Sequence, residues 1–295
     1  MLPFITHNQA EAQCFAVFSP PITLYRKHMN TEGVVFASPH SGSQYPKAFT
    51  RRSRLPLAAL RRNEDAYIDR VISDLPLYGV PTLKANFPRC FVDVNRAPDE
   101  TLPEWGGDNA PKTARAAAGL GVVPTIISEH LPIYKTPLPE AVLTARLETL
   151  YYPYHAALKN LLAEAQDRCG QALLIDCHSM PGRNLSGKQR SDIILGDRFG
   201  ASARPDFVQC AEDVFKAAGY NVSRNHPYAG GYVTSTYGQP NQGTHVIQIE
   251  VNRDIYMNPA SLKLTDGFEP LKDCFTTLGK TLVQYIKADL ARAAE

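Results

Sequence analysis

Short apolar runs alternate with longer amphipathic segments along most of this 295-residue chain. The runs have the length of strands, and several are apolar throughout, as in strands buried on both faces of a sheet. They span residues 33–38, 80–85, 89–94, 171–176, 191–196 and 244–251. Apolar positions recur with helical spacing over 55–75, about 139–169, 204–219 and within 268–294. This alternation predicts a three-layer α/β/α fold around a mixed, mostly parallel sheet.

The length of the chain favours a single domain. About 300 residues suit one α/β domain with a large buried sheet. Residues 97–136 contain many glycines and prolines and show little regular period. We therefore expect one α/β domain over 1–295, with 97–136 as an insertion or lid.

Composition narrows the range of partners. The 31 basic and 29 acidic residues leave a net charge of +2, too little to neutralise nucleic-acid phosphates or an anionic membrane. No apolar run reaches the roughly 18 residues that span a bilayer, and the N-terminus lacks the basic region of a signal peptide. We expect a cytoplasmic protein that binds neither nucleic acid nor membrane, with a small molecule as its partner.

Polar residues stand where four of the apolar runs end. In open α/β sheets, ligands bind beyond the carboxyl ends of the strands, so we expect these side chains to share one polar crevice. A buried charge without a partner costs several kcal/mol, and convergence would remove that cost. The residues are His40, Asn95, Arg96, His178, Glu250 and Arg253.

Two of these histidines predict a metal site. Neutral imidazole is a favoured zinc ligand, and catalytic zinc usually has three protein ligands and one water. His40 and His178 are the first two expected ligands. Glu64 and Asp65 lie side by side after His40, and we expect Glu64 to be the third ligand, with Asp65 as the alternative. Zinc is the expected metal, although other divalent ions could share such ligands.

Glu250 lies inside an apolar, β-branched strand. We interpret it as a general base with a raised pKa that faces a metal-bound water. The alternative is one half of a buried ion pair with Arg96 or Arg253.

Arg96 and Arg253 each end a V-N-R sequence. The planar guanidinium matches a carboxylate through two parallel hydrogen bonds, so the pair predicts a substrate with one or two carboxylates. The alternative for each arginine is a structural salt bridge with a nearby aspartate, namely Asp93, Asp99 or Asp254.

Three further residues surround the predicted ligand His178. Asp176 is two residues earlier and shares its strand face, so it could orient the imidazole. Asp192 could do the same from a neighbouring strand. Cys177 could serve as a nucleophile, but adjacent strand residues point to opposite faces, which disfavours that role.

Seven segments together resemble the N-formylglutamate amidohydrolase family over about 33–258. They are SPHSG (38–42), NEDAYIDRV (63–71), FPRCFVDVNR (87–96), IDCHSMPG (175–182), SDIILGDRFG (191–200), NHPYAGGY (225–232) and HVIQIEVNRDIYM (245–257). The resemblance implies a zinc-exopeptidase type of fold, similar to metallocarboxypeptidases and aspartoacylase. One departure is Ser43, at the position where metallocarboxypeptidases carry their ligand glutamate.

The resemblance also implies an activity. It would be zinc-dependent hydrolysis of N-formyl-L-glutamate to formate and L-glutamate, the last step of one bacterial route of histidine degradation. Glu250 would take the proton of the attacking water, and Arg96 with Asn95 would grip a substrate carboxylate, with Arg253 as a second clamp. The alternatives are a zinc carboxypeptidase or another N-acyl amino acid deacylase, a non-catalytic dicarboxylate-binding protein, and a metal-independent cysteine amidase.

Overall fold

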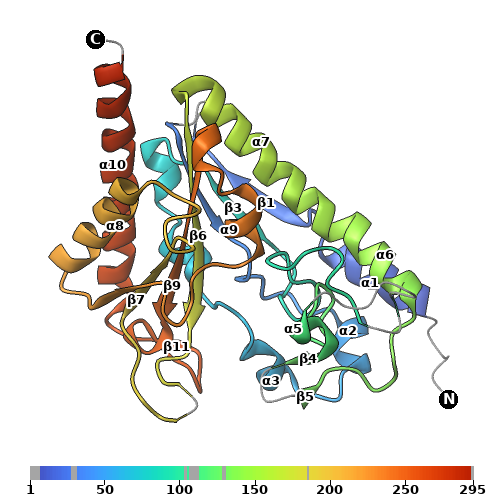
Figure 1. Ribbon diagram of the computed structural model, residues 1–295. Helices are drawn as coiled ribbons and strands as arrows, with labels where there is room; N and C mark the ends of the chain where they lie inside the picture. The colour runs from blue at the N-terminus through green and yellow to red at the C-terminus, as the bar shows by residue number, and fades with distance from the viewer. Residues whose placement is uncertain are drawn as a thin grey trace. The chain divides into compact units, whose positions relative to one another are not determined.

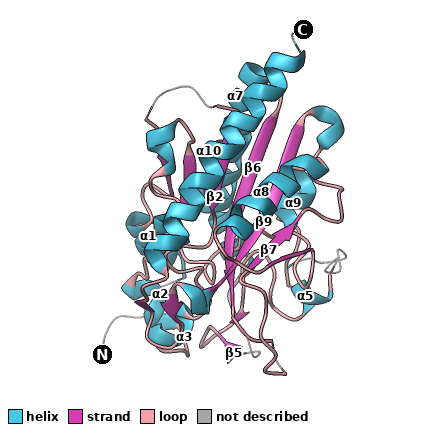
Figure 2. Ribbon diagram, turned by 90° about the vertical axis from the view of Figure 1, so that its left-hand side faces the viewer, coloured by secondary structure: helices cyan, strands magenta, loops and turns pink. Residues whose placement is uncertain are grey.

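Seven strands form the main sheet of the computed structural model, which describes residues 7–27, 32–102, 105, 113–127, 131–184 and 186–293. The strand order is β1-β3-β2-β6-β9-β7-β8. In that order they span Ile22–Tyr25, Thr82–Ala85, Val34–Ser38, Ala172–Met180, Thr244–Asn252, Ile193–Gly196 and Val222–Arg224. β6 pairs in parallel with β2 and β9, β7 runs antiparallel to β9, and β8 is parallel to β7. The predicted mixed, mostly parallel α/β sheet is confirmed, and β6 and β9 lie side by side in it (Figure 2).

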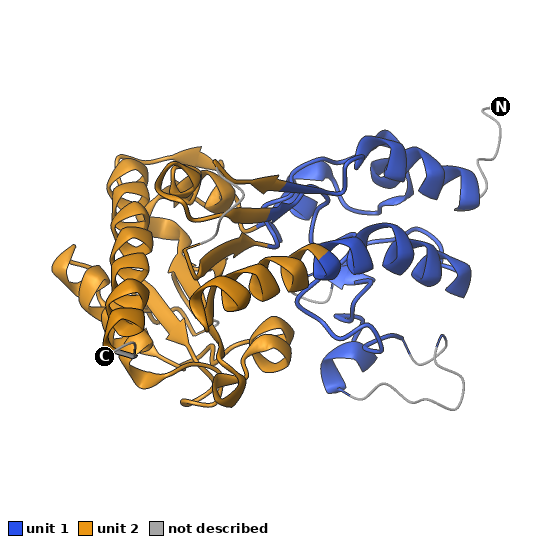
Figure 3. Cartoon of the chain, turned by 90° about the horizontal axis from the view of Figure 1, so that it is seen from above, with its two compact units in different colours: residues 1–23, 39–64, 84–156 blue, residues 24–38, 65–83, 157–295 orange. Residues whose placement is uncertain are grey.

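The chain divides into two compact units (Figure 3). The first comprises residues 1–23, 39–64 and 84–156, and the second comprises 24–38, 65–83 and 157–295. Each unit is therefore built from three separate stretches of sequence. The expected single domain stays a prediction.

In the second unit, one face of the sheet packs on an apolar cluster. Helices α8 (Pro205–Ala217) and α10 (Phe268–Ala293) lie on the same side of the sheet and contribute to this cluster (Figure 1). Short helices α4 (Ile68–Val71) and η1 (Leu75–Tyr78) add to it. Cys177 of β6 belongs to the cluster, whereas its neighbours on the strand do not. The opposite face of β6 and β9 therefore carries the alternate, more polar residues.

The helix α9 (Tyr232–Tyr237) packs against β9. The remaining elements of this unit are short. They are the 3-10 turns Pro240–Gln242 and Arg253–Ile255 and the hairpin of β10 (Met257–Asn258) with β11 (Lys263–Leu264). The long helix α7 (Tyr152–Cys169) begins in the first unit and ends in the second.

The first unit is mainly short helices joined by loops. They are α1 (His7–Val17), α2 (Lys47–Arg52), α3 (Leu57–Arg61), α5 (Ala114–Ala117), α6 (Glu140–Arg146) and a π turn over Leu147–Tyr151. The expected insertion 97–136 holds α5 and a small hairpin of β4 (Ile126–Ile127) and β5 (Leu131–Pro132). Its role as a lid stays a prediction. No described helix is long and apolar enough to cross a membrane.

The prediction of a strand over residues 89–94 is wrong. This segment forms turns, beginning with the hydrogen bond from the N–H of Phe91 to the carbonyl of Pro88, at 2.8 Å. Phe91, Val92 and Val94 are fully buried, so the segment is apolar because it fills the core of the first unit. A short apolar run does not by itself distinguish a strand from a buried loop.

A buried ion pair joins α1 to α6. The Arg146 guanidinium donates to both carboxylate oxygens of Glu11 at 2.9 Å and lies over the Phe91 ring at 3.5 Å. Both residues are buried. Burial raises the pKa of Glu11, but Arg146 and Arg52 outweigh it, so the pKa lies below its usual range. Removal of one partner would leave the other charge buried and uncompensated.

We expect Arg146→Met to lower the free energy of unfolding by about 3–5 kcal/mol, because Glu11 would remain buried without its partner. Urea denaturation at pH 7 measures this. The double variant Arg146→Met/Glu11→Gln should recover part of the loss, and Arg168→Met on the exposed side of α7 is the control. Because the folded pKa of Glu11 is lowered, the pair stabilises at neutral pH and loses its effect as pH falls through that pKa. An equal loss in the single and double variants would contradict this.

Candidate active site

The register of β6 and β9 places four polar side chains on one face of the sheet. Asp176 pairs with Gln248, and His178 pairs with Glu250. Positions two apart on a strand share a face, so all four project from the side opposite the apolar cluster. All four are buried, with exposed fractions of 8% or less. Buried polar side chains such as these require hydrogen-bond partners.

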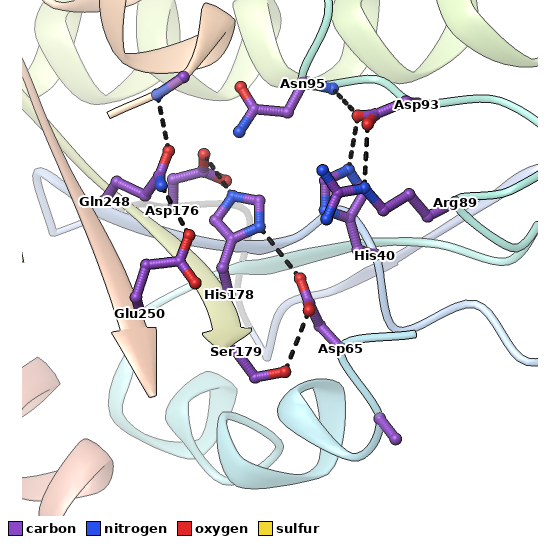
Figure 4. Close-up of polar contacts among 12 residues, drawn as sticks. His40, Asp65, Arg89, Asp93, Asn95, Asp176, His178, Ser179, Gln248 and Glu250 are labelled. Carbon is purple, nitrogen blue, oxygen red and sulfur yellow. Dashed lines mark hydrogen bonds and ion pairs between the residues drawn. The ribbon is translucent and has the colours of Figure 1, made fainter. Parts of the chain in front are cut away.

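Both ring nitrogens of His178 meet carboxylates (Figure 4). Nε2 lies 2.9 Å from Asp176 Oδ2, and Nδ1 lies 3.1 Å from Asp65 Oδ2. Burial lowers the pKa of His178, but Asp176 and Asp65 outweigh it and hold the pKa well above its usual value. The expected contact between Asp176 and His178 is present in the structure.

Asp65 has two further partners. Its Oδ1 accepts hydrogen bonds from the Ser179 hydroxyl and from Arg253 Nη2, each at 3.0 Å. Arg253 Nε also donates to the Ser179 hydroxyl, at 2.9 Å. The guanidinium of Arg253, which we expected to bind a substrate carboxylate, therefore holds a carboxylate of the protein. Arg253 thus forms a structural salt bridge, which was the alternative expectation, and its partner is Asp65. Sequence reasoning did not identify Ser179.

Glu250 is held through Gln248. The Gln248 amide donates from Nε2 to Glu250 Oε1 at 2.9 Å, and its Oε1 accepts the N–H of Gly231 at 2.8 Å. Gly231 immediately precedes α9, so this amide connects Glu250 to the loop before that helix (Figure 4). The alternative of an ion pair between Glu250 and Arg96 or Arg253 stays a prediction. The alternation of Q-I-E in the strand was the signal that could have identified Gln248.

In the first unit, His40 is bonded to Asp93. His40 Nε2 lies 2.8 Å from Asp93 Oδ1, and both residues are buried. The other oxygen of Asp93 accepts Arg89 Nε at 2.9 Å, and the N–H of Asn95 donates to Oδ1 at 2.9 Å. Burial raises the pKa of Asp93, but Arg89, Arg96 and His40 outweigh it, so the pKa lies well below its usual range. The sequence suggested Asp93 only as an arginine partner.

Arg96 makes mainly internal contacts. Nε donates to the Leu120 carbonyl at 3.2 Å, Nη1 donates to the Asn95 carbonyl at 2.9 Å, and Nε lies 3.8 Å from an Asp93 oxygen. These contacts agree with the alternative that Arg96 has a structural role beside Asp93. The side chain of Arg96 keeps an exposed fraction of 12%. Its role as a carboxylate clamp, with the buried Asn95, stays a prediction.

Two other expected site residues have different partners. Glu64 accepts Arg61 Nε at 2.9 Å and Arg61 Nη2 at 3.2 Å, so both of its oxygens are used. This geometry favours Asp65 over Glu64 as a metal ligand. Asp192 accepts the N–H of Asn221 at 2.9 Å, and no described contact joins it to His178. We expected Asp192 to orient His178 from a neighbouring strand. That expectation is wrong, because β9 lies between β6, which carries His178, and β7, which directly follows Asp192.

The described residues include one group of possible metal ligands, formed by His40, Asp65 and His178, all buried. Chain connectivity supports the group. Ala37 of β2 pairs with Asp176, and His40 follows Ala37 by three positions, roughly 11 Å of chain at most. Two imidazoles and a carboxylate form a donor set that suits zinc and similar divalent ions. Asp176 Oδ1 is also buried without a hydrogen-bond partner, which leaves negative charge that a nearby cation would balance.

Comparisons with known proteins agree on one family. The family model of N-formylglutamate amidohydrolase matches residues 32–257. An N-formylglutamate deformylase from Pseudomonas putida is 28% identical over 91% of this chain and 96% of its own, and one from Pseudomonas aeruginosa is 30% identical over 76% and 82%. The crystal structure of N-formylglutamate amidohydrolase from Ralstonia eutropha JMP134 superposes with a TM-score of 0.85 and 29% identity, over 91% of this chain and 99% of that one.

Cys177 lies on the wrong face of β6 to act as a nucleophile. Its thiol is fully buried in the apolar cluster, and burial raises its pKa well above the usual value. A thiol in this state reacts slowly, because the thiolate is the reactive form.

We therefore expect Cys177 in the folded protein to resist alkylation by iodoacetamide, whereas the partly exposed Cys210 reacts. Peptide mass spectrometry after timed labelling measures both thiols in one sample. In urea the two should react at similar rates. Rapid labelling of Cys177 in the native protein would contradict the placement of this side chain.

Proposed function

The chain belongs to the N-formylglutamate amidohydrolase family, and from this premise we propose that it hydrolyses the N-formyl amide of N-formyl-L-glutamate to formate and L-glutamate. The observation that carries the proposal is the group of His40, Asp65 and His178, together with Glu250 opposite His178 in the sheet. Two relatives named N-formylglutamate deformylase support the substrate. The products are those of the last step of one route of histidine degradation.

We propose that His40, Asp65 and His178 hold a divalent metal, with zinc as the first choice. When bound, the metal supplies Lewis acidity, which lowers the pKa of a coordinated water from about 15.7 towards about 7 and polarises a carbonyl oxygen. Asp65 replaces Glu64 as the proposed third ligand because Arg61 occupies both oxygens of Glu64.

The aspartates behind the two histidines support this assignment. His40 has Nε2 bonded to Asp93, and His178 has Nε2 bonded to Asp176. With a metal bound, each Nε2 would donate its proton to the aspartate, which as a carboxylate only accepts hydrogen bonds, and Nδ1, which in His178 faces Asp65 Oδ2 at 3.1 Å, would bind the metal. Histidine ligands are commonly oriented by a carboxylate in this way.

Glu250 is the proposed general base. It accepts the proton of the attacking water and then donates that proton to the nitrogen of the departing glutamate. Gln248 is a positioning residue in this scheme, because its amide bonds Glu250 Oε1 and is itself held by the Gly231 N–H. Both ends of the amide are used, so its orientation is determined by its neighbours.

Asn95 and Arg96 are the proposed clamp for one substrate carboxylate. The contacts of Arg96 involve Nε and Nη1, so Nη2 remains available for a further hydrogen bond in the described part of the chain. Arg253 instead positions Asp65 and is no longer proposed as a second clamp. Holding the amide near the reacting groups can supply several kcal/mol of the rate enhancement.

The first test is formate release from N-formyl-L-glutamate by the protein as purified, after chelation, and after zinc is restored. We expect activity to be lost on chelation and regained with zinc. Asp65→Asn should lower activity by at least about 100-fold, more than the loss typical of a group behind a ligand, and should lower the zinc content. Glu64→Gln is the matched control and should retain both activity and zinc.

The outcomes separate the parts of the proposal. Zinc loss in Glu64→Gln, with none in Asp65→Asn, would reverse the ligand assignment. Full activity after exhaustive chelation would exclude the metal. Hydrolysis of blocked peptides or other N-acyl amino acids, with no formate from N-formyl-L-glutamate, would reject the substrate.

We expect Glu250→Gln to lower kcat by about 10²- to 10⁴-fold, because the variant cannot transfer the proton. Its zinc content should match that of the original protein. Gln248→Met should lower kcat by a smaller factor and leave KM nearly unchanged. In the Glu250→Gln background, Gln248→Met should have no further effect on kcat, because the group it positions is absent. Equal effects of Gln248→Met in both backgrounds would indicate a structural role alone.

A further inference from the structure

Arg190 lies in the loop that follows β6, close to the end of that strand. Its backbone N–H donates to the Gly182 carbonyl at 2.9 Å. Its Nη1 donates to the carbonyls of Pro181 and Arg183, at 2.7 and 2.8 Å. Pro181 is three residues beyond His178, so these bonds anchor the guanidinium beyond the carboxyl end of the strand that carries a proposed metal ligand.

The opposite edge of this guanidinium has no partner. Nε is buried and makes no hydrogen bond, and the two described hydrogen bonds of the side chain both use Nη1. No carboxylate of the described residues forms an ion pair with Arg190. The edge formed by Nε and Nη2 is the edge that receives a carboxylate through two parallel hydrogen bonds.

The other two arginines near the strand ends differ from Arg190 because each has an acidic neighbour. Arg253 is paired with Asp65, and Arg96 lies beside Asp93 and donates to two backbone carbonyls. Arg190 alone among these three has a positive charge that no described acidic residue balances. A half-buried guanidinium with a free edge is suited to an anionic ligand.

A second loop, which contains Tyr228, also contacts the Arg190 side chain. The guanidinium carbon lies 5.5 Å from the centre of the Tyr228 ring. The loop of Tyr228 is anchored by the N–H of Arg198, which donates to the Ala229 carbonyl at 2.8 Å, and by the N–H of Gly231, which donates to Gln248. The loop that contacts Arg190 is thus the loop that holds the proposed positioning residue of Glu250.

Strand pairing places Arg190 beyond the carboxyl end of β9, the strand that carries Glu250. Ile194 of β7 pairs with Glu250, and the N–H of Asn252 donates to the Asp192 carbonyl at 2.8 Å. Arg190 precedes Asp192 by two residues, so it lies one further step beyond the carboxyl end of β9. Ligands of open α/β sheets bind in this region.

We propose that Arg190 binds the side-chain carboxylate of the substrate and restricts the enzyme to N-formyl amino acids with an acidic side chain. This inference rests on the proposed function, in which Asn95 and Arg96 bind the other carboxylate. Arg190 donates from Nε and Nη2, Tyr228 covers its guanidinium, and the bonds of Nη1 keep the fork in place before substrate arrives. Such preorganisation lowers the entropy lost on binding.

The test compares N-formyl-L-glutamate with N-formyl-L-glutamine, which has nearly the same shape and an uncharged side chain. We expect Arg190→Gln to lower kcat/KM for N-formyl-L-glutamate by roughly 10- to 100-fold, mainly through KM, because a charged hydrogen-bonded pair is lost. The kcat/KM for N-formyl-L-glutamine should change little. Arg190→Lys should show an intermediate loss, since it keeps the charge and loses the fork. Lys188→Gln, which removes a positive charge from an exposed position of the same loop, is the control and should behave as the original protein.

The possible results are distinct. An equal loss on both substrates in Arg190→Gln, or no loss on either, would overturn the role of Arg190 in specificity. Failure of the original protein to hydrolyse either substrate would reject the proposed function instead. In that case, binding of L-glutamate and L-glutamine to the zinc-loaded protein, measured by calorimetry, still tests Arg190. A preference for L-glutamate that Arg190→Gln abolishes would support it, and no such preference would overturn it.

Discussion

The parallel pairing of β6 with β9 is the constraint on which the candidate site depends. Its register sets His178 opposite Glu250 and Asp176 opposite Gln248, while Cys177 faces the apolar cluster. A shift by one residue would turn the polar side chains into that cluster and the apolar ones out of it. The packing of α8 and α10 on the apolar face therefore specifies the register that the chemistry requires.

Within this register, acidic and basic side chains are matched by hydrogen bonds. His40 and His178 each have Nε2 bonded to an aspartate, and Asp65 is held by Ser179 and Arg253. At low local dielectric such contacts are strong, and an unmatched charge is costly. Arg253, which seemed suited to substrate, is thereby used to hold Asp65, whereas Arg96 makes its internal hydrogen bonds through Nε and Nη1 only. Arg190, whose free edge lies beyond the strand end, is left as the group suited to a second carboxylate.

Much of the site could be predicted because its residues interrupt apolar strands. His178 and Glu250 are conspicuous for this reason, and Asp176 follows from the period of two along a strand. Asp93 and Gln248 were missed, since their roles depend on which distant side chains they meet. The strand expected over 89–94 failed for a related reason, because burial in a loop produces the same apolar run as burial in a sheet. Asp192 was misplaced because the order of strands in a sheet does not follow their order in the chain.

The sequence by itself determined the α/β class, the family resemblance that the comparisons confirm, and the face of each strand on which its side chains lie. These properties are local, since they depend on residue type and on a spacing of two or about four along the chain. Only the tertiary structure shows that Arg61 holds Glu64, that Arg253 holds Asp65 and that Nε of Arg190 has no partner. Those distinctions depend on hydrogen bonds between residues such as Asp65 and Arg253, which are distant in sequence and meet only because the strands pair in one order.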